Sequence, residues 1–415
     1  MKAHNATPLV TSVPVGAAPR MLGCLSASAV SSAEPQVASA RPANKNKIPA
    51  PAIEPTELSA PMQTLVRAFL GYPRSAQARI KYLRRRVPAE IYKVLPELEA
   101  RFDAQVAAVD INEAFVRALV ADVASIPKDY ELPEPWEASP HEDGWVLGAF
   151  HALKREWADE GSRERAQSIG AMLEALEHFM PLPQADAPKP RILIPGAGLF
   201  RQAWECSVRG YVAVGVEQTI MMCAVARFML TLLTEGRQLP MCPHVHEFHG
   251  PTNVYSASHL SRAVHVPGEE ALALARADRA AVSRGSMRVV CERLEAHVRK
   301  SLGSYDVALT CFYLDASGDV VGAIEDVAAA LRPGGIWISC GPLEYDGTSG
   351  GHTTGALRLC ADEVLLYIQR RGFELLEVRR QTCLYTYDEQ SMFNPAFESL
   401  FFVARKTARD DNGEH

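Results

Sequence analysis

No stretch of this 415-residue sequence approaches the roughly 20 consecutive apolar residues that a membrane-spanning helix requires. Its nine cysteines form no C-x-x-C pair and no regular pattern, which argues against a disulfide framework and favours reduced thiols inside a cell. A basic excess is missing as well, because the formal net charge is -6. We therefore expect a globular cytoplasmic protein with no membrane or nucleic-acid partner, and we leave a nuclear location open.

Acidic residues are scarce at the beginning of the chain, where residues 1–55 hold only Glu34 and Glu54. This segment is rich in Ala, Ser and Pro and has no apolar period, so it predicts a disordered tail. The same composition, with basic residues such as Arg20 and Arg41, also suits an organellar transit peptide. In that case the location would be organellar.

Residues 56–185 show a helical pattern. Apolar side chains recur at the spacing i, i+4, i+7 and i+11 in Ile91, Leu95, Leu98 and Phe102. We interpret this part as a helical cap or lid domain. The basic run KYLRRR at 81–86 is interpreted as a solvated helix face rather than a nucleic-acid contact.

Residues 186–408 alternate between strand-like and helix-like segments, which predicts a parallel sheet. The expected strands are 191–195, 212–216, 307–312, 336–340, 373–384 and 400–404, and the expected helices are 202–208, 219–235 and 323–331. The final two strands are close enough in sequence to pair antiparallel. The predicted fold class is therefore α/β.

A glycine-rich turn stands where the first expected strand meets a helix. Gly196 and Gly198 let the backbone approach a bulky ligand there, and Glu217 follows at the end of the second strand, where a carboxylate accepts hydrogen bonds from ribose hydroxyls. A dinucleotide would call for a third glycine near Phe200 or Gln202, and neither position has one. The pattern favours an adenosine cofactor without a pyrophosphate, although a tight turn with no ligand also accounts for the glycines alone.

Four segments carry a more specific resemblance: PGAGLFRQAWE at 195–205, GYVAVGVEQT at 210–219, the run from Thr310 to Tyr345, and the tail from Leu384 to Lys406. Together with LKREWADEGSRER at 153–165 they resemble the carnosine N-methyltransferase family. The resemblance implies a Rossmann-like, seven-stranded methyltransferase sheet with an antiparallel last strand. It also implies S-adenosylmethionine as the cofactor and a small-molecule or dipeptide substrate, methylated on an imidazole nitrogen as in carnosine. A homodimer is compatible with the sequence.

The resemblance also assigns cofactor-binding residues by position. Arg155 would bind the carboxylate of the cofactor's methionine part, a task that a guanidinium suits. Glu292 would meet the adenine amino group and Cys311 would lie against the cofactor, beside Gly196, Gly198 and Glu217. Two positions depart from the family pattern: Phe200 replaces a glycine, and Arg293 replaces an aromatic residue near the adenine, where it would stack on the ring.

The acceptor site is expected at the end of the strand that contains Cys311. Asp315 would accept a hydrogen bond from the proton-bearing nitrogen of an imidazole, which leaves the other nitrogen facing the methyl group. The alternative for Asp315 is a helix N-cap. The resemblance adds Tyr345, Tyr385 and Tyr387 around the substrate, with Asp315 and Tyr387 as catalytic residues, whereas tyrosines in a loop are otherwise packing residues.

One further departure concerns specificity. Asp346 stands where the family has a histidine after the tyrosine of the Gly-Pro-Leu segment, and the changed charge bears on which dipeptide is preferred.

The run CPHVHEFH invites a metal interpretation, since Cys242, His244, His246 and His249 lie within eight residues. Their spacing matches no common zinc pattern closely. We therefore expect no metal.

Three alternatives stay open at this stage. The first is a methyltransferase of the same fold that acts on another small heterocyclic amine or on a peptidyl histidine. The second is a non-catalytic module whose cofactor pocket Phe200 and Arg293 have closed. The third is an RNA methyltransferase, which would depend on the KYLRRR run; no Asn/Asp-Pro-Pro-aromatic motif supports it.

Overall fold

A computed structural model of the protein describes residues 58–126, 130, 132, 140–184, 187–245, 254–280, 285–345 and 357–408. The tail expected over residues 1–55 lies outside these ranges, as do His246, His249 and Asp346. Within the described residues, no helix is both long enough and apolar enough to cross a membrane.

The main sheet has seven strands in the order β5-β2-β1-β6-β7-β9-β8. The strands are β1 (Arg191–Pro195), β2 (Val212–Glu217), β5 (Ser286–Cys291), β6 (Tyr305–Cys311), β7 (Leu331–Gly341), β8 (Phe373–Leu384) and β9 (Ala396–Lys406). The first five pair in parallel, whereas β9 runs antiparallel to both β7 and β8. The predicted α/β fold, with a seven-stranded sheet and an antiparallel last strand, is confirmed.

Helices cover both faces of this sheet. One face packs against α6 (Ala171–Phe179), α7 (Arg201–Val208) and α8 (Ile220–Glu235). The other packs against α10 (Leu294–Val298), α11 (Val320–Ala330) and α12 (Ala361–Arg370). Because β1, β2 and β6 are buried on both sides, nearly all their residues are apolar, and this made them recognisable in the sequence. The expected strand at 191–195 and the expected strand at 373–384 match β1 and β8.

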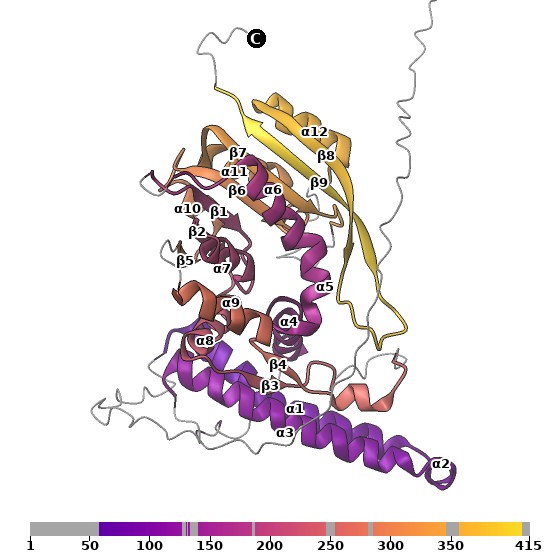
Figure 1. Ribbon diagram of the computed structural model, residues 1–415. Coiled ribbons are helices and arrows are strands. Elements are labelled where there is room, and N and C mark those ends of the chain that lie inside the picture. Colours follow the sequence, from indigo (N-terminus) through magenta and orange to yellow (C-terminus); the bar gives the residue numbers. More distant parts are fainter. Residues whose placement is uncertain are drawn as a thin grey trace, which may run out of the picture. The chain divides into compact units, whose positions relative to one another are not determined.

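The helical segment shares its core with the rest of the chain. Its helices α1 (Ala60–Arg86) and α3 (Glu97–Ala124) lie side by side and are joined by α2 (Ala89–Val94) (Figure 1). One buried apolar cluster links them to α4 (Pro140–Trp157), α8, α9 (Glu269–Ala280) and the small sheet of β3 (Leu239–Met241) and β4 (Val264–Val266). A boundary between residues 185 and 186 therefore does not separate two hydrophobic cores.

The apolar period noted from Ile91 to Phe102 is divided between two helices. α2 ends at Val94, and α3 begins after Pro96, whose ring removes a backbone donor and breaks the helix. Ile91 and Leu95 are largely exposed, whereas Phe102 is buried in the core.

A chain of short helices leads from α4 to the sheet: η2 (Asp159–Gly161), α5 (Ser162–Arg165), the π-helix η3 (Ala166–Gly170) and then α6. Contacts between residues of α5 and η3 and the strand β8 place this run along the edge of the sheet. A π-helical turn inside a longer helix is rare and frequently marks a functional site.

Phe200 occupies space next to the sheet. It adopts the left-handed region (φ 62°) immediately before α7, and its side chain is fully buried. A Cβ atom on Gly215 of β2 would lie 2.5 and 2.6 Å from two ring carbons of Phe200. The ring therefore packs directly on the strand where the glycine leaves room.

We expect Gly215→Ala to lower the free energy of unfolding by about 1–3 kcal/mol, because the added methyl group overpacks the contact with Phe200. Thermal unfolding measures the effect. Gly148→Ala is the matched control, since its Cβ would meet nothing within 4 Å and alanine favours the helix α4. A wild-type melting temperature for Gly215→Ala would contradict this packing.

Candidate active site

The turn after β1 has a conformation that glycine favours. Gly196 and Gly198 have φ values of 59° and 53°, in the left-handed region. A Cβ on Gly196 would lie 2.5 Å from a ring carbon of Tyr313. Glu217 accepts a hydrogen bond from Gly198 N at 3.1 Å and from Thr219 N at 2.8 Å. Its carboxylate therefore ties the glycine turn to the end of β2 and keeps lone pairs for a ligand.

Two cavities meet at this turn. One, of about 320 Å³, is lined by Glu217, Glu292 and Arg293 among others. The second, of about 390 Å³, is lined by Arg155, Gly198, Cys311, Asp315 and Tyr385 among others. Both include Gly196, Phe312 and Ala316 in their walls. An elongated ligand that crosses the glycine turn would occupy both.

Glu292 and Arg293 stand in the wall of the first cavity. Glu292 Oε1 lies 2.9 Å from His297 Nδ1, and Glu292 Oε2 accepts from Lys300 Nζ at 2.6 Å. The hydrogen bond from Lys300, followed by that from His297, lowers the pKa of Glu292, so the residue is an ionised acceptor. The Arg293 side chain is 71% exposed and lies 3.9 Å from Glu295, so it does not fill the cavity.

Arg155 and Cys311 belong to the second cavity. Arg155 Nη2 donates to Glu156 Oε1 at 3.0 Å. Burial lowers the pKa of Arg155, but the neighbouring Glu156 outweighs it, so the pKa is raised and the guanidinium remains charged. Glu156 Oε2 in turn accepts from Leu199 N in the glycine-rich turn. Burial raises the pKa of the Cys311 thiol to about 12, so this residue is neutral.

Asp315 is fixed by two backbone amides. Its Oδ1 accepts from Ala316 N at 3.1 Å and its Oδ2 accepts from Glu344 N at 3.0 Å, which joins the end of β6 to the loop after β7. It does not cap the following helix: Asp319 is the N-cap of α11 and accepts from Gly322 N at 2.9 Å. The helix-cap interpretation of Asp315 is therefore wrong.

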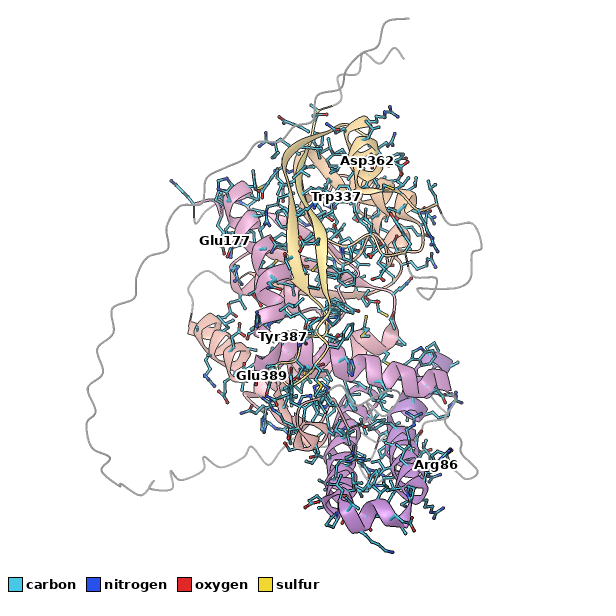
Figure 2. The ribbon with its side chains drawn as sticks, turned by 90° about the vertical axis from the view of Figure 1, so that its right-hand side faces the viewer. Arg86, Glu177, Trp337, Asp362, Tyr387 and Glu389 are labelled. Carbon is cyan, nitrogen blue, oxygen red and sulfur yellow. The ribbon has the colours of Figure 1, made fainter. Side chains whose placement is uncertain are left out.

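The three expected tyrosines have different surroundings. Tyr385 lines the second cavity and stacks on Phe312, with ring centroids 5.9 Å apart. Tyr387 lies where the loop after β8 approaches the helices (Figure 2), and its hydroxyl accepts from Arg163 Nη1 at 2.8 Å. The Tyr345 hydroxyl donates to Leu359 O at 3.0 Å, and neither Tyr345 nor Tyr387 is among the residues in the cavity wall.

Two residues at or next to the site have a backbone conformation that non-glycine residues rarely adopt. Within the described part of the chain, the non-glycine residues with positive φ are Ser125, Phe200, Phe312 and Thr386. Phe312 is in the cavity wall and Thr386 stands between the two tail tyrosines. Such strain persists only where the surrounding structure fixes it, and it concentrates at functional sites.

Sequence reasoning missed several residues that build the site. Glu164 is buried and accepts the backbone N–H groups of Thr386 and Tyr387. Burial raises the pKa of Glu164, while the charge of Arg155 and these backbone bonds lower it. Lys154 forms an ion pair with Asp388. The only available signal was the charged run at 153–165, from which Arg155 alone was selected.

The run at 242–249 does not form a site of its own among the described residues. Cys242 makes backbone hydrogen bonds to Asn112. His244 lies with His259 and Asp388, and in the described part of the chain this trio is the group whose donor atoms could reach one metal ion. His246 and His249 lie outside the described residues. The expectation of no metal remains a prediction.

The family model and the curated proteins that match this chain all carry the description carnosine N-methyltransferase. Residues 139–408 match the family model described as carnosine N-methyltransferase. The carnosine N-methyltransferase of Mus musculus is 26% identical over 352 residues, which cover 82% of this chain and 85% of the mouse protein. That of Schizosaccharomyces pombe is 25% identical over 269 residues, with 63% and 70% covered. The Drosophila melanogaster protein named carnosine N-methyltransferase unmet is 24% identical over 374 residues, with 83% and 79% covered.

The N-cap of α11 gives a test of helix stability. We expect Asp319→Ala to lower the free energy of unfolding by about 1 kcal/mol, because Gly322 N loses its acceptor, and Asp319→Asn to leave it unchanged, because asparagine caps equally well. Denaturant unfolding measures both. Equal stability of the alanine variant and the wild type would show that Asp319 does not cap the helix.

Proposed function

This chain belongs to the carnosine N-methyltransferase family, and on that premise we propose that it transfers a methyl group from S-adenosylmethionine to an imidazole nitrogen of carnosine or a related histidine dipeptide. The single observation that carries the proposal is the meeting of two cavities at the glycine turn. Glu217, a carboxylate placed to bind ribose hydroxyls, lines the first cavity. Asp315 and Tyr385 line the second.

The residues present fit the cofactor. Gly196 and Gly198 place no side chain at the turn, and Glu217 offers lone pairs in the first cavity. Arg155 offers a charged guanidinium in the second cavity, where the carboxylate of the methionine part would lie. When bound, S-adenosylmethionine supplies a methyl group on a positively charged sulfur.

Phe200 does not obstruct this site, because its ring packs on Gly215 and is not part of either cavity wall. Arg293 stays largely exposed at the rim of the first cavity. The alternative of a non-catalytic module therefore loses the physical reason that motivated it.

We assign Asp315 the task of orienting the acceptor. The amides of Ala316 and Glu344 hold its carboxylate in the wall of the second cavity, where a carboxylate oxygen can accept a hydrogen bond from an imidazole N–H. Accepting this hydrogen bond fixes one tautomer and leaves the lone pair of the other ring nitrogen free to attack. The negative charge also stabilises the imidazolium that forms as the methyl group arrives.

Aromatic faces complete the acceptor wall. Tyr385, stacked on Phe312, faces the same cavity as Asp315. The negative face of an aromatic ring attracts a cation, so these rings suit a pocket in which positive charge moves from the donor to the imidazole. Tyr387 lies outside the cavity wall, and its hydroxyl accepts from Arg163 Nη1, so its catalytic role stays a prediction.

Cofactor binding should depend on Glu217. We expect Glu217→Ala to weaken S-adenosylmethionine binding at least about tenfold, because the ribose hydroxyls lose their acceptor at a cost of roughly 1–3 kcal/mol. Calorimetric titration of the folded variant measures the dissociation constant. Unchanged affinity would remove the ribose site from this position.

Turnover should depend on Asp315. We expect Asp315→Asn to lower kcat for carnosine about a hundredfold, because a charge-assisted hydrogen bond is replaced by a weaker neutral one, while cofactor affinity stays within about a factor of three. Asp362→Asn is the matched control and should keep full activity, because Asp362 is an exposed carboxylate in α12 and lines neither cavity. A fully active Asp315→Asn enzyme would refute the assignment, and a panel of histidine dipeptides, peptidyl histidines and heterocyclic amines identifies the preferred acceptor.

A further inference from the structure

The side chains of Glu164 and Lys154 form hydrogen bonds with the backbone between Tyr385 and Asp388. Glu164 Oε1 accepts a hydrogen bond from Thr386 N and Glu164 Oε2 accepts one from Tyr387 N, both at 3.0 Å. Lys154 Nζ donates to Tyr387 O at 3.0 Å and lies 2.5 Å from Asp388 Oδ2. Neither side chain belongs to the loop itself, since Lys154 stands in α4 and Glu164 in α5. Consecutive peptide groups are thus held from outside by charges of opposite sign.

These contacts are buried, so they are costly to leave unmade. The side chains of Lys154 and Asp388 are each 8% exposed, and Glu164 is buried as well. A buried charge is tolerated when partners compensate its lost hydration. Burial by itself would raise the pKa of Asp388, but His244 and Lys154 hold it well below the usual value, so the carboxylate is ionised.

Asp388 lies close to His244 and His259 and already forms an ion pair with Lys154. His244 Nε2 lies 3.1 Å from Asp388 Oδ2, the same oxygen that Lys154 contacts, and His259 Nε2 lies 3.6 Å from Oδ1. A metal ion bound by this trio would compete with the Lys154 ammonium for that oxygen. The arrangement therefore favours an anchor for the loop over a metal site.

The anchor acts at a strained residue. Thr386 has a φ of 53°, in the left-handed region that non-glycine residues rarely adopt. The two N–H groups that Glu164 binds lie on either side of the Thr386 Cα, so the carboxylate fixes both peptide planes at this residue. The conformation of Thr386 in turn determines where the neighbouring tyrosines point.

We propose that Glu164 and Lys154 are positioning residues for the methyl acceptor: they hold Thr386 in its left-handed conformation and thereby keep the ring of Tyr385 in the wall of the acceptor cavity. Without them, Tyr385 would lose its stacking on Phe312 and the cavity would lose an aromatic face. The inference rests on the proposed function, because it assigns the acceptor to this cavity.

The test is Glu164→Gln, which keeps the shape of the side chain. A glutamine offers one carbonyl oxygen, so its NH₂ group faces the second backbone N–H as donor against donor. We expect the Thr386 and Tyr387 amides to exchange with solvent deuterium at least about tenfold faster. We also expect kcat/KM for carnosine to fall at least about tenfold, mainly through KM, with cofactor affinity within about a factor of three.

Glu174→Gln is the matched control, because Glu174 is an exposed carboxylate in the adjoining helix α6 and should leave every readout unchanged. Unaltered exchange and kinetics in Glu164→Gln would overturn the proposal. A parallel loss of cofactor binding would overturn it as well, because Glu164 lines the second cavity beside Arg155 and would then act on the cofactor rather than through Tyr385. If the variant does not fold, amide exchange in the wild-type protein decides. Exchange of the Thr386 and Tyr387 amides as fast as in an unstructured peptide would overturn the anchor, whereas slow exchange would support it. Failure of the wild-type enzyme to methylate carnosine would refute the proposed function. The exchange measurement would still show whether Glu164 anchors the loop.

Discussion

Carboxylate side chains that accept hydrogen bonds from backbone N–H groups hold each loop of the site. Glu217 and Glu156 fix the glycine turn after β1, Asp315 joins the end of β6 to the loop after β7, and Glu164 fixes the loop between β8 and β9. Such bonds are stronger than those between neutral groups. Because four loops converge on one pair of cavities, these bonds together fix the backbone that forms the cavity walls.

The parallel strands and the glycine turn could be predicted from the sequence because their signals are local. RILIP is a continuous apolar run, and Gly196 and Gly198 follow it directly. β5 was not placed, since it is a largely exposed strand at the sheet edge without a continuous apolar run. The break between α2 and α3 was also missed, although Pro96 marks it.

The site was predictable only in part because its partners are far apart in sequence. Arg155, Asp315 and Tyr385 were chosen from motifs, and the structure brings them into one cavity. Glu164 could not be chosen, because its role depends on amides 222 and 223 residues away and nothing local distinguishes it from a solvated helix charge. Similarly, Asp319 rather than Asp315 caps α11, a choice that depends on where the helix begins.

The order of strands has a consequence for how the enzyme is made. β8 meets the rest of the main sheet only through β9, which follows it in the chain and lies between β7 and β8. During synthesis, β8 therefore has no neighbour in that sheet until β9 has emerged, although the glycine turn and its parallel strands are already complete. The part of the sheet that carries the glycine turn and Glu217 can therefore pair before β8 and β9, the strands on either side of Tyr385, have joined it.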